Sequence, residues 1–333
     1  MHLPDGYLSP ATCATFGAGM VPAWYVGGQR VRKVVKSRYV PLLALGSAYC
    51  FLVMMFNVPI PDGTTAHAVG GVLVAVLLGP WAALVAVSTA LLIQALFFGD
   101  GGVLTYGANC FNMALVMPMS GYGVYRLLAR NTSLTSPRRA LAAGIGGYVG
   151  INMAALGAAV ELGLQPTLFH DAHGAPLYAP FHLSQTIPTM VGAHLLVAGF
   201  VELALTVGVV RYLQRANVPV LRINHRDTPE GDDLAPSRQL SWRWAWIGLA
   251  TMVVLTPVGL LAPGGAFGED APASVRVWTS ALFDGYGFRG GKHPTVGYIF
   301  SAAFGIVVIA TVLFAVVKLS QRRRGRDDAP ITA

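Results

Sequence analysis

Long apolar runs are the feature that most restricts how this chain can fold. Runs of roughly 18 to 25 apolar residues recur along most of its 333 residues, and each can cross about 30 Å of hydrocarbon. Because backbone N–H and C=O groups must find partners inside lipid, such runs favour helices. With 54% hydrophobic residues, 11% charged residues and a mean hydropathy of +0.56, we expect an all-α, polytopic membrane helical bundle.

Basic residues give these runs a direction. Of the 23 lysines and arginines, 20 fall into four clusters, at residues 30–38, 126–139, 211–243 and 318–326. Because lysine and arginine accumulate in cytoplasmic loops, the clusters predict which end of each run faces the cytosol. The net charge of +8 therefore reflects orientation in a lipid bilayer, and we expect no nucleic-acid partner.

The direction of successive apolar runs can be alternated so that every basic cluster lies inside, which we call threading the chain through the membrane. This threading predicts nine spans with the N-terminus outside. The expected spans are residues 10–28, 39–57, 67–79, 80–98, 108–128, 140–164, 182–210, 242–261 and 295–318. Gly79 and Pro80 divide the stretch 67–98, because proline ends a helix and glycine permits the turn. A charged segment separates the first seven spans from the last two. We therefore expect a membrane domain at 1–213, a cytosolic linker at 214–240 and a two-helix membrane part with an outer loop at 241–333.

The chain begins MHLPDGYLSP, and a second-position histidine gives a free N-terminus three nitrogen donors for one metal ion. The donors are the Met1 amine, the His2 backbone amide and the His2 imidazole Nδ1, which close two chelate rings in one plane. No removable signal peptide is predicted, so we expect Met1 to stay on the mature chain. The threading places His67, in VPIPDGTTAH, at the same outer face, where its imidazole would supply a fourth nitrogen.

A planar set of four nitrogens suits Ni(II) or Cu(II), whereas zinc prefers a tetrahedron and Mg²⁺ or Ca²⁺ prefer oxygen ligands. Plainer interpretations remain open from the residues alone. A histidine in a terminal segment is usually solvated, and His67 is equally suited to capping a helix.

Three segments resemble the CbiM and NikM substrate-capture (S) components of energy-coupling-factor cobalt and nickel transporters. They are MHLPDGYLSP, then PIPDGTTAHAVGG with LLGPWAAL, and YGANCFNMAL, and the similarity covers about residues 1–213. The resemblance implies that Met1, His2 and His67 hold the metal. Residues 240–320 look like the small CbiN or NikN component fused to the first, with LFDGYGF at 282–288 where that family has PDGLE.

The resemblance also implies how such a chain works. An S component captures Ni(II) or Co(II) outside the cell membrane of a bacterium or archaeon and releases it inward, driven by a transmembrane T component and ABC-type ATPase subunits on separate chains. This sequence has no Walker A pattern, so we expect no ATPase activity, no catalytic residues and no organic cofactor. Nickel members often begin MHIPDG, so the start MHLPDG favours nickel over cobalt as the substrate.

Several polar residues admit both a functional and a structural interpretation. Asn109 and Asn112, just inside the outer end of a span, are candidates to hydrogen-bond the histidines or the N-terminal loop, or to link helices. His194 and Glu202 lie about two turns apart on one face of a span. We expect them to form a structural polar pair, with a role in translocation as the alternative.

The remaining candidates are expected to be structural. Two aspartates are expected to fix turns rather than to attract cations: Asp5 and Asp62. Three outer-loop histidines are expected to be solvated, with metal capture as the alternative: His170, His173 and His182. Three cysteines are expected to be buried core residues, with soft metal ligation as the alternative: Cys13, Cys50 and Cys110. Three tryptophans are expected to form an interfacial belt: Trp242, Trp244 and Trp246.

Two other functions compete with metal capture. A stand-alone divalent-metal channel or secondary carrier needs a continuous polar path, yet ionisable residues within the spans are few, with His194 and Glu202 among them. An intramembrane metalloenzyme needs a motif such as HExxH or an acid/base pair near the ligands, and the sequence contains neither. Both alternatives are therefore disfavoured.

Overall fold

The computed structural model describes residues 1–34, 40–60, 63–226, 228–230, 243–261, 281–288, 291 and 293–327. Some sequence predictions lie outside these residues: the turn at Asp62, the interfacial role of Trp242, the charged linker after residue 230, and the outer loop at 262–280. Apart from one two-residue ribbon, the described chain is an all-α membrane protein.

Nine helices of the described chain have about three turns or more. The longer helices are α1 (Pro10–Val34), α2 (Val40–Met54), α4 (Pro80–Ile93), α6 (Met117–Leu128), α7 (Pro137–Gly163), α9 (Leu183–Ala193), α10 (Gly199–Ala216), α12 (Arg243–Leu255) and α13 (Pro294–Asp327). Shorter elements are α3 (Gly71–Leu78), α5 (Tyr106–Asn109), α8 (Gln165–Leu168), α11 (Val218–Arg222), and the 3-10 turns η5 (Thr256–Leu261) and η8 (Asp284–Tyr286). Strands β1 (Val58–Pro59) and β2 (Thr65–Ala66) pair antiparallel, with Val58 opposite Ala66.

Within the described residues, three helical rods contain a π-helical segment. η2 (Gln94–Phe98) continues α4, η3 (Cys110–Val116) joins α5 to α6, and η4 (His194–Ala198) joins α9 to α10. A π turn accommodates an extra residue in the helix and is frequent at functional sites. Each of these segments begins at or directly after a buried polar residue: Gln94, Asn109 or His194.

Four helical stretches of the described chain are long and apolar enough to cross a membrane: Pro80–Phe98, Pro137–Leu168, Leu183–Ala216 and Pro294–Val316. Shorter apolar helices lie at Val40–Met54 and Trp246–Leu261. The prediction of a helical membrane protein is therefore confirmed. The predicted break in the stretch 67–98 is also present, since Gly79 precedes α4 and Pro80 is its first residue.

The expected span at 67–79 is not a full span. The helix in this stretch, α3, has eight residues and therefore rises about 12 Å, less than half of the hydrocarbon thickness. It packs against α4, α6 and α7, and all but one of its residues are buried. Protein therefore surrounds this short helix on most sides.

Side chains from distant segments hold both ends of α3. At its N-terminal end, the carboxylate of Glu202 in α10 accepts the N–H groups of Val69 at 2.8 Å and Gly70 at 2.9 Å. At its C-terminal end, Asn224 Nδ2 donates to the Ala75 carbonyl at 3.1 Å. The first N–H and last C=O groups of a helix have no partner within the helix. Tertiary contacts therefore stabilise a helix that is too short to stand alone.

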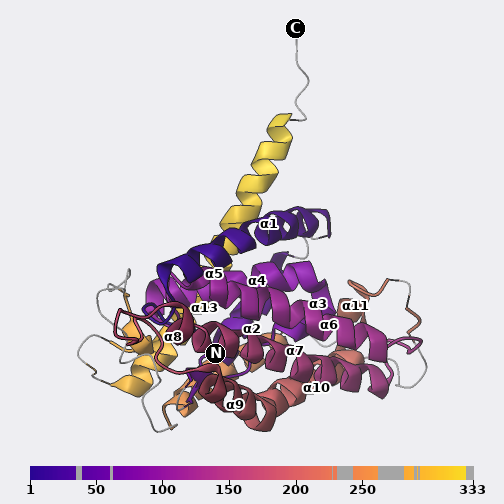
Figure 1. Ribbon diagram of the computed structural model, residues 1–333. Helices are drawn as coiled ribbons and strands as arrows, with labels where there is room; N and C mark the ends of the chain where they lie inside the picture. The colour runs from indigo at the N-terminus through magenta and orange to yellow at the C-terminus, as the bar shows by residue number, and fades with distance from the viewer. Residues whose placement is uncertain are drawn as a thin grey trace.

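The helices pack around α7, which lies against α6, α9 and α10 (Figure 1). Glycines bring α6 and α7 close together, since a Cβ at Gly121 would lie 2.6 Å from the Gly146 carbonyl oxygen. Such small-residue contacts are typical of helix interfaces in membranes. α13 packs along α2, and its last turns project beyond the rest of the bundle (Figure 1).

Candidate metal centre

Residues 1–9 run into the bundle instead of forming an exposed tail. Met1, Leu3 and Leu8 are at most 1% exposed, and His2 is 4% exposed. Asn109 holds this segment, because its Oδ1 accepts the Leu3 N–H at 2.8 Å and its Nδ2 donates to the Leu3 carbonyl at 3.0 Å. Asn109 therefore makes the contact with the N-terminal loop that was one of the two interpretations of its position.

A turn at residues 4–6 sets the direction of the N-terminal segment. Gly6 has φ 94°, in the left-handed region that favours glycine. The Asp5 carboxylate accepts the N–H groups of Leu104 at 2.9 Å and Thr105 at 3.2 Å. A Cβ at Gly102 would lie 1.9 Å from Asp5 Oδ1, so the two loops are in direct contact. The structure thus confirms the turn-fixing role predicted for Asp5.

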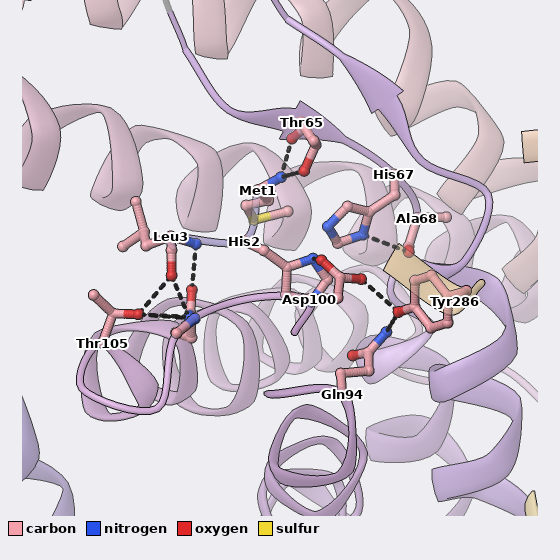
Figure 2. A network of polar contacts seen from close by, with 12 residues as sticks. Met1, His2, Leu3, Thr65, His67, Ala68, Gln94, Asp100, Thr105 and Tyr286 are labelled. Carbon is pink, nitrogen blue, oxygen red and sulfur yellow. Dashed lines mark hydrogen bonds and ion pairs between the residues drawn. The ribbon is translucent and has the colours of Figure 1, made fainter. Parts of the chain in front are cut away.

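The N-terminal amine and two imidazole rings meet next to the β1–β2 ribbon. The Met1 amine donates to the Thr65 carbonyl and, at 2.6 Å, to Thr65 Oγ1 (Figure 2). His2 stacks on His67, with the ring centroids 4.6 Å apart and the planes at 24°. Residues 1–9 and the stretch around 58–67 are therefore neighbours, as the threading predicts.

The hydrogen bonds of His67 determine which of its nitrogens is available as a ligand. His67 Nδ1 lies 3.0 Å from the Ala68 carbonyl, which only accepts, so Nδ1 carries the proton. His67 Nε2 is buried and makes no hydrogen bond within the described chain. Both ring nitrogens of His2 are buried too, and its Nδ1 lies 3.2 Å from a carboxylate oxygen of Asp100. Burial lowers the pKa of the Met1 amine, of His2 and of His67 below their ordinary values. Burial therefore favours the neutral forms, whose lone pairs bind metals.

These nitrogens can supply a ligand set that comes partly from the main chain. Within the described residues, no group of three or more His, Cys, Asp or Glu side chains is arranged to hold a metal ion. The candidate set is different, because two of its donors are the Met1 amine and the His2 amide. Together with His2 Nδ1 and His67 Nε2 they would provide four nitrogens, a set suited to Ni(II) or Cu(II).

Three residues that sequence reasoning missed lie beside His2. Asp100 Oδ1 is 3.2 Å from His2 Nδ1, and Tyr286 OH donates to Asp100 Oδ2 at 2.5 Å (Figure 2). Gln94 Nε2 donates to Tyr286 OH at 2.9 Å. Gln94 is the single polar residue of the apolar stretch ALLIQALFF at 90–98, and Asp100 follows in the loop FFGDGG. For Tyr286, the available signal was its place in LFDGYGF, in a predicted outer loop.

Glu202 and His194 make separate contacts, so the predicted polar pair is wrong. Glu202 holds the backbone two and three residues after His67. His194 Nδ1 lies 2.7 Å from the Met190 carbonyl, and its Nε2 is buried without a hydrogen bond in the described chain. Met190 Sδ accepts the Thr64 N–H at 3.3 Å, so the helix face that carries Met190 packs on the ribbon next to His67. The eight-residue spacing placed both residues on one helix face without showing what each would meet there.

The other candidates lie away from the histidine pair. Asn112 Nδ2 donates to both oxygens of Glu161 at 3.0 Å, which links η3 to α7 and matches the interhelical interpretation. Asp171 Oδ1 accepts the N–H groups of His173 and Ala175 at 2.8 Å, a local turn in an exposed loop. The other two histidines of that region are exposed as well: His170 and His182. All three cysteines are buried and free: Cys13, Cys50 and Cys110.

Comparison with known proteins identifies the family. The model of CbiM, the cobalt uptake substrate-specific transmembrane region, matches residues 2–220. The chain belongs to the CbiM family. It is therefore a multi-pass membrane transport component and not an enzyme, and the resemblance noted in the sequence is confirmed.

Individual CbiM-type proteins are similar over most of this chain. The fused nickel transport protein NikMN of Rhodobacter capsulatus is 52% identical over 81% of this chain and 75% of its own length. The probable fused nickel transport protein LarMN of Lactiplantibacillus plantarum is 44% identical over 94% of this chain and 96% of its own length. A crystal structure of a transition metal transporter is 53% identical, with a TM-score of 0.63 over 68% of this chain and 100% of that one.

Proposed function

We propose that this chain captures Ni(II), with Co(II) as a second possible substrate, through the Met1 amine, the His2 amide, His2 Nδ1 and His67 Nε2. The observation that carries the proposal is the convergence of the buried Met1 amine with the stacked rings of His2 and His67. On binding, the amine exchanges its hydrogen bonds to Thr65 for the metal. A planar field of four nitrogens favours Ni(II), and both fused relatives described above are nickel transport proteins.

The transport cycle that fits this site begins at the extracytoplasmic face. The N-terminus lies outside, with seven spans before the linker at 214–240 and two after it, and α3 is a half-length member of the set. Residues 1–213 capture the metal, and residues 241–333 correspond to a fused CbiN- or NikN-like part. A T component and ABC-type ATPases on separate chains would drive inward release. Basic clusters at the predicted inner ends of the spans support this orientation.

The decisive experiment blocks the amine. One residue is added ahead of Met1, the full chain is purified in detergent, and Ni(II) binding is measured by calorimetry together with the visible spectrum. We expect stoichiometric binding to be lost, because the extension converts the amine to an amide and removes it from the chelate. The matched control carries one extra residue after Ala333 and should bind Ni(II) like the unmodified chain. Binding of equal affinity with an unchanged planar spectrum in the blocked chain would refute the N-terminal chelate.

The fourth nitrogen has its own test. His67→Ala should lose Ni(II) while the protein keeps its melting behaviour, since the ring makes a single hydrogen bond, to its neighbour Ala68. His170→Ala removes an exposed histidine from the outer loop and serves as the control. Retained stoichiometric binding in His67→Ala would remove His67 from the site.

A further inference from the structure

Charge balance is the physical problem that the proposed metal site raises. A divalent ion bound to one deprotonated amide and three neutral nitrogens keeps one positive charge. Met1, His2 and His67 are each at most 4% exposed, so this charge would lie in the protein interior. A buried charge without a partner is strongly unfavourable. The site therefore needs an anion close by.

Asp100 is the carboxylate that lies against a proposed ligand residue. Its Oδ1 is 3.2 Å from His2 Nδ1, and its side chain is 12% exposed (Figure 2). The other buried carboxylates of the described chain are engaged elsewhere. Asp5 and Glu202 accept backbone N–H groups, and Glu161 accepts an asparagine amide.

A residue from the C-terminal part holds Asp100 in place. Tyr286, in η8, donates its hydroxyl proton to Asp100 Oδ2 at 2.5 Å and accepts from Gln94 Nε2 at 2.9 Å. Its ring stacks on Phe98 with the centroids 5.0 Å apart, and the residue is 3% exposed. Figure 2 shows Gln94, Tyr286, Asp100 and His2 in one continuous row. Tyr286 thus leaves Asp100 Oδ1 directed at His2 while it occupies the other oxygen.

We propose that Asp100 is the counter-ion of the metal-loaded site and that Tyr286 is its positioning residue. The inference rests on the proposed metal site and goes beyond it, since neither residue is one of the four-nitrogen ligands. It also gives residues 281–288 a defined task in metal binding, in that the C-terminal part supplies the group that orients the counter-ion. A residue that only helped to assemble the bundle would not be expected to act on metal affinity. The proposed role predicts that replacing Tyr286 or Asp100 weakens metal binding while the four nitrogen donors stay the same.

The size of the effect follows from Coulomb's law. With Asp100 Oδ1 3.2 Å from His2 Nδ1 and a metal–nitrogen bond of about 2 Å, a metal on that nitrogen lies no more than about 5 Å from the carboxylate oxygen. At an effective dielectric constant of about 20, removing the charge should weaken binding about a hundredfold, which is about 2.8 kcal/mol. Tyr286→Phe leaves the charge and removes its orientation, so a loss of about tenfold is expected, as for outer partners of metal ligands in general.

The first experiment tests the charge. Asp100→Asn is compared with Asp171→Asn, which removes the same charge from an exposed loop turn. Ni(II) affinity is measured by calorimetry, and the donor set is read from the electron paramagnetic resonance spectrum of bound Cu(II). We expect Asp100→Asn to bind about a hundredfold more weakly with an unchanged nitrogen pattern, and Asp171→Asn to bind normally. An unchanged affinity in Asp100→Asn, an equal loss in both variants, or an altered Cu(II) donor set would each overturn the counter-ion.

The second experiment tests the positioning residue. Tyr286→Phe is compared with Tyr25→Phe, whose ring lies 68% exposed on α1. About tenfold weaker Ni(II) binding in Tyr286→Phe alone supports the proposal, and equal affinity in the two variants refutes the role of Tyr286. Absence of Ni(II) binding in the unmodified chain is a separate outcome, because it refutes the proposed function itself. Asp100→Glu, which keeps the charge, should recover part of the affinity if Asp100→Asn is weak for electrostatic reasons.

Discussion

Glu202→Gln probes how the protein holds the loop that carries His67. The Glu202 carboxylate accepts the Val69 N–H at 2.8 Å and the Gly70 N–H at 2.9 Å, directly before α3 begins. Glutamine has the same shape but a single acceptor oxygen. Both N–H groups donate to Oε2 at these distances, and the Gly70 N–H also lies 3.2 Å from Oε1. If the amide oxygen of glutamine takes the place of Oε2, both bonds persist to a neutral acceptor, while the NH₂ group faces the Gly70 N–H, donor against donor.

The magnitude follows from these two bonds. A hydrogen bond to a charged acceptor contributes about 1.5 to 3 kcal/mol and one to a neutral acceptor about 0.5 to 1.5 kcal/mol, so removing the charge weakens the two bonds by about 2 to 3 kcal/mol together. We expect the free energy of unfolding to fall by about 2 to 3 kcal/mol, which lowers the melting temperature of a chain of 333 residues by roughly 3 to 4 °C. Because His67 lies two residues before Val69, its ring should also lose its fixed position. Ni(II) affinity should then fall about tenfold, the lower end of the range for residues that orient metal ligands.

The assay compares two buried glutamates in the full chain purified in detergent. Glu161 lies in α7 and accepts Asn112 Nδ2 at 3.0 Å, away from the His67 loop. Glu161→Gln therefore removes a carboxylate from the bundle and leaves that loop untouched. Thermal melting and Ni(II) calorimetry on both variants separate a general effect of buried charge from a local effect on α3. Equal Ni(II) affinity in Glu202→Gln and the unmodified chain, or an equal loss in both variants, would refute the reasoning.

Two further predictions concern the N-terminal segment. Asn109→Ala removes both hydrogen bonds to Leu3 and should lower stability by about 2 kcal/mol and weaken Ni(II) binding, whereas Asn152→Ala, at a half-buried helix position, should bind normally. Melting curves and calorimetry test this, and normal binding in Asn109→Ala would show that Asn109 does not hold the chelate in place. Stability should also fall as the pH drops through 8.0 and 6.5, because burial lowers the pKa of the Met1 amine, His2 and His67 in the folded chain, so the unfolded chain binds more protons. A melting temperature that rises over the same decrease in pH would contradict the buried, neutral form of these groups.

Sequence reasoning recovered most of the helical layout. Apolar length, basic clusters and the Gly79–Pro80 break are local properties, and the helix bounds follow them closely. The length of α3 was not predictable in this way, because its apolar residues fit a longer helix equally well. Its ends depend on Glu202 and Asn224, which meet it only after the bundle has packed.

The same division applies to the candidate site. The donors of Met1 and His2 are adjacent in the chain, so their chelate geometry follows from covalent structure, and His67 was added from the threading alone. Asn109 and Asn112 had equal claims in the sequence, and packing turned one toward Leu3 and the other toward Glu161. The amino-acid sequence gives the type and spacing of side chains, but it does not show which partners they will contact in the folded protein.

The sequence by itself therefore determined a multi-span helical membrane protein and the nitrogen donors at its N-terminus, because both depend on composition and on neighbouring residues. The tertiary structure alone decided what surrounds those donors. Asp100 and Tyr286 are 186 positions apart and meet beside His2. Contacts of such long range are fixed by how complete helices and loops pack, and the apolar pattern that directs this packing carries no information about which polar groups will face each other.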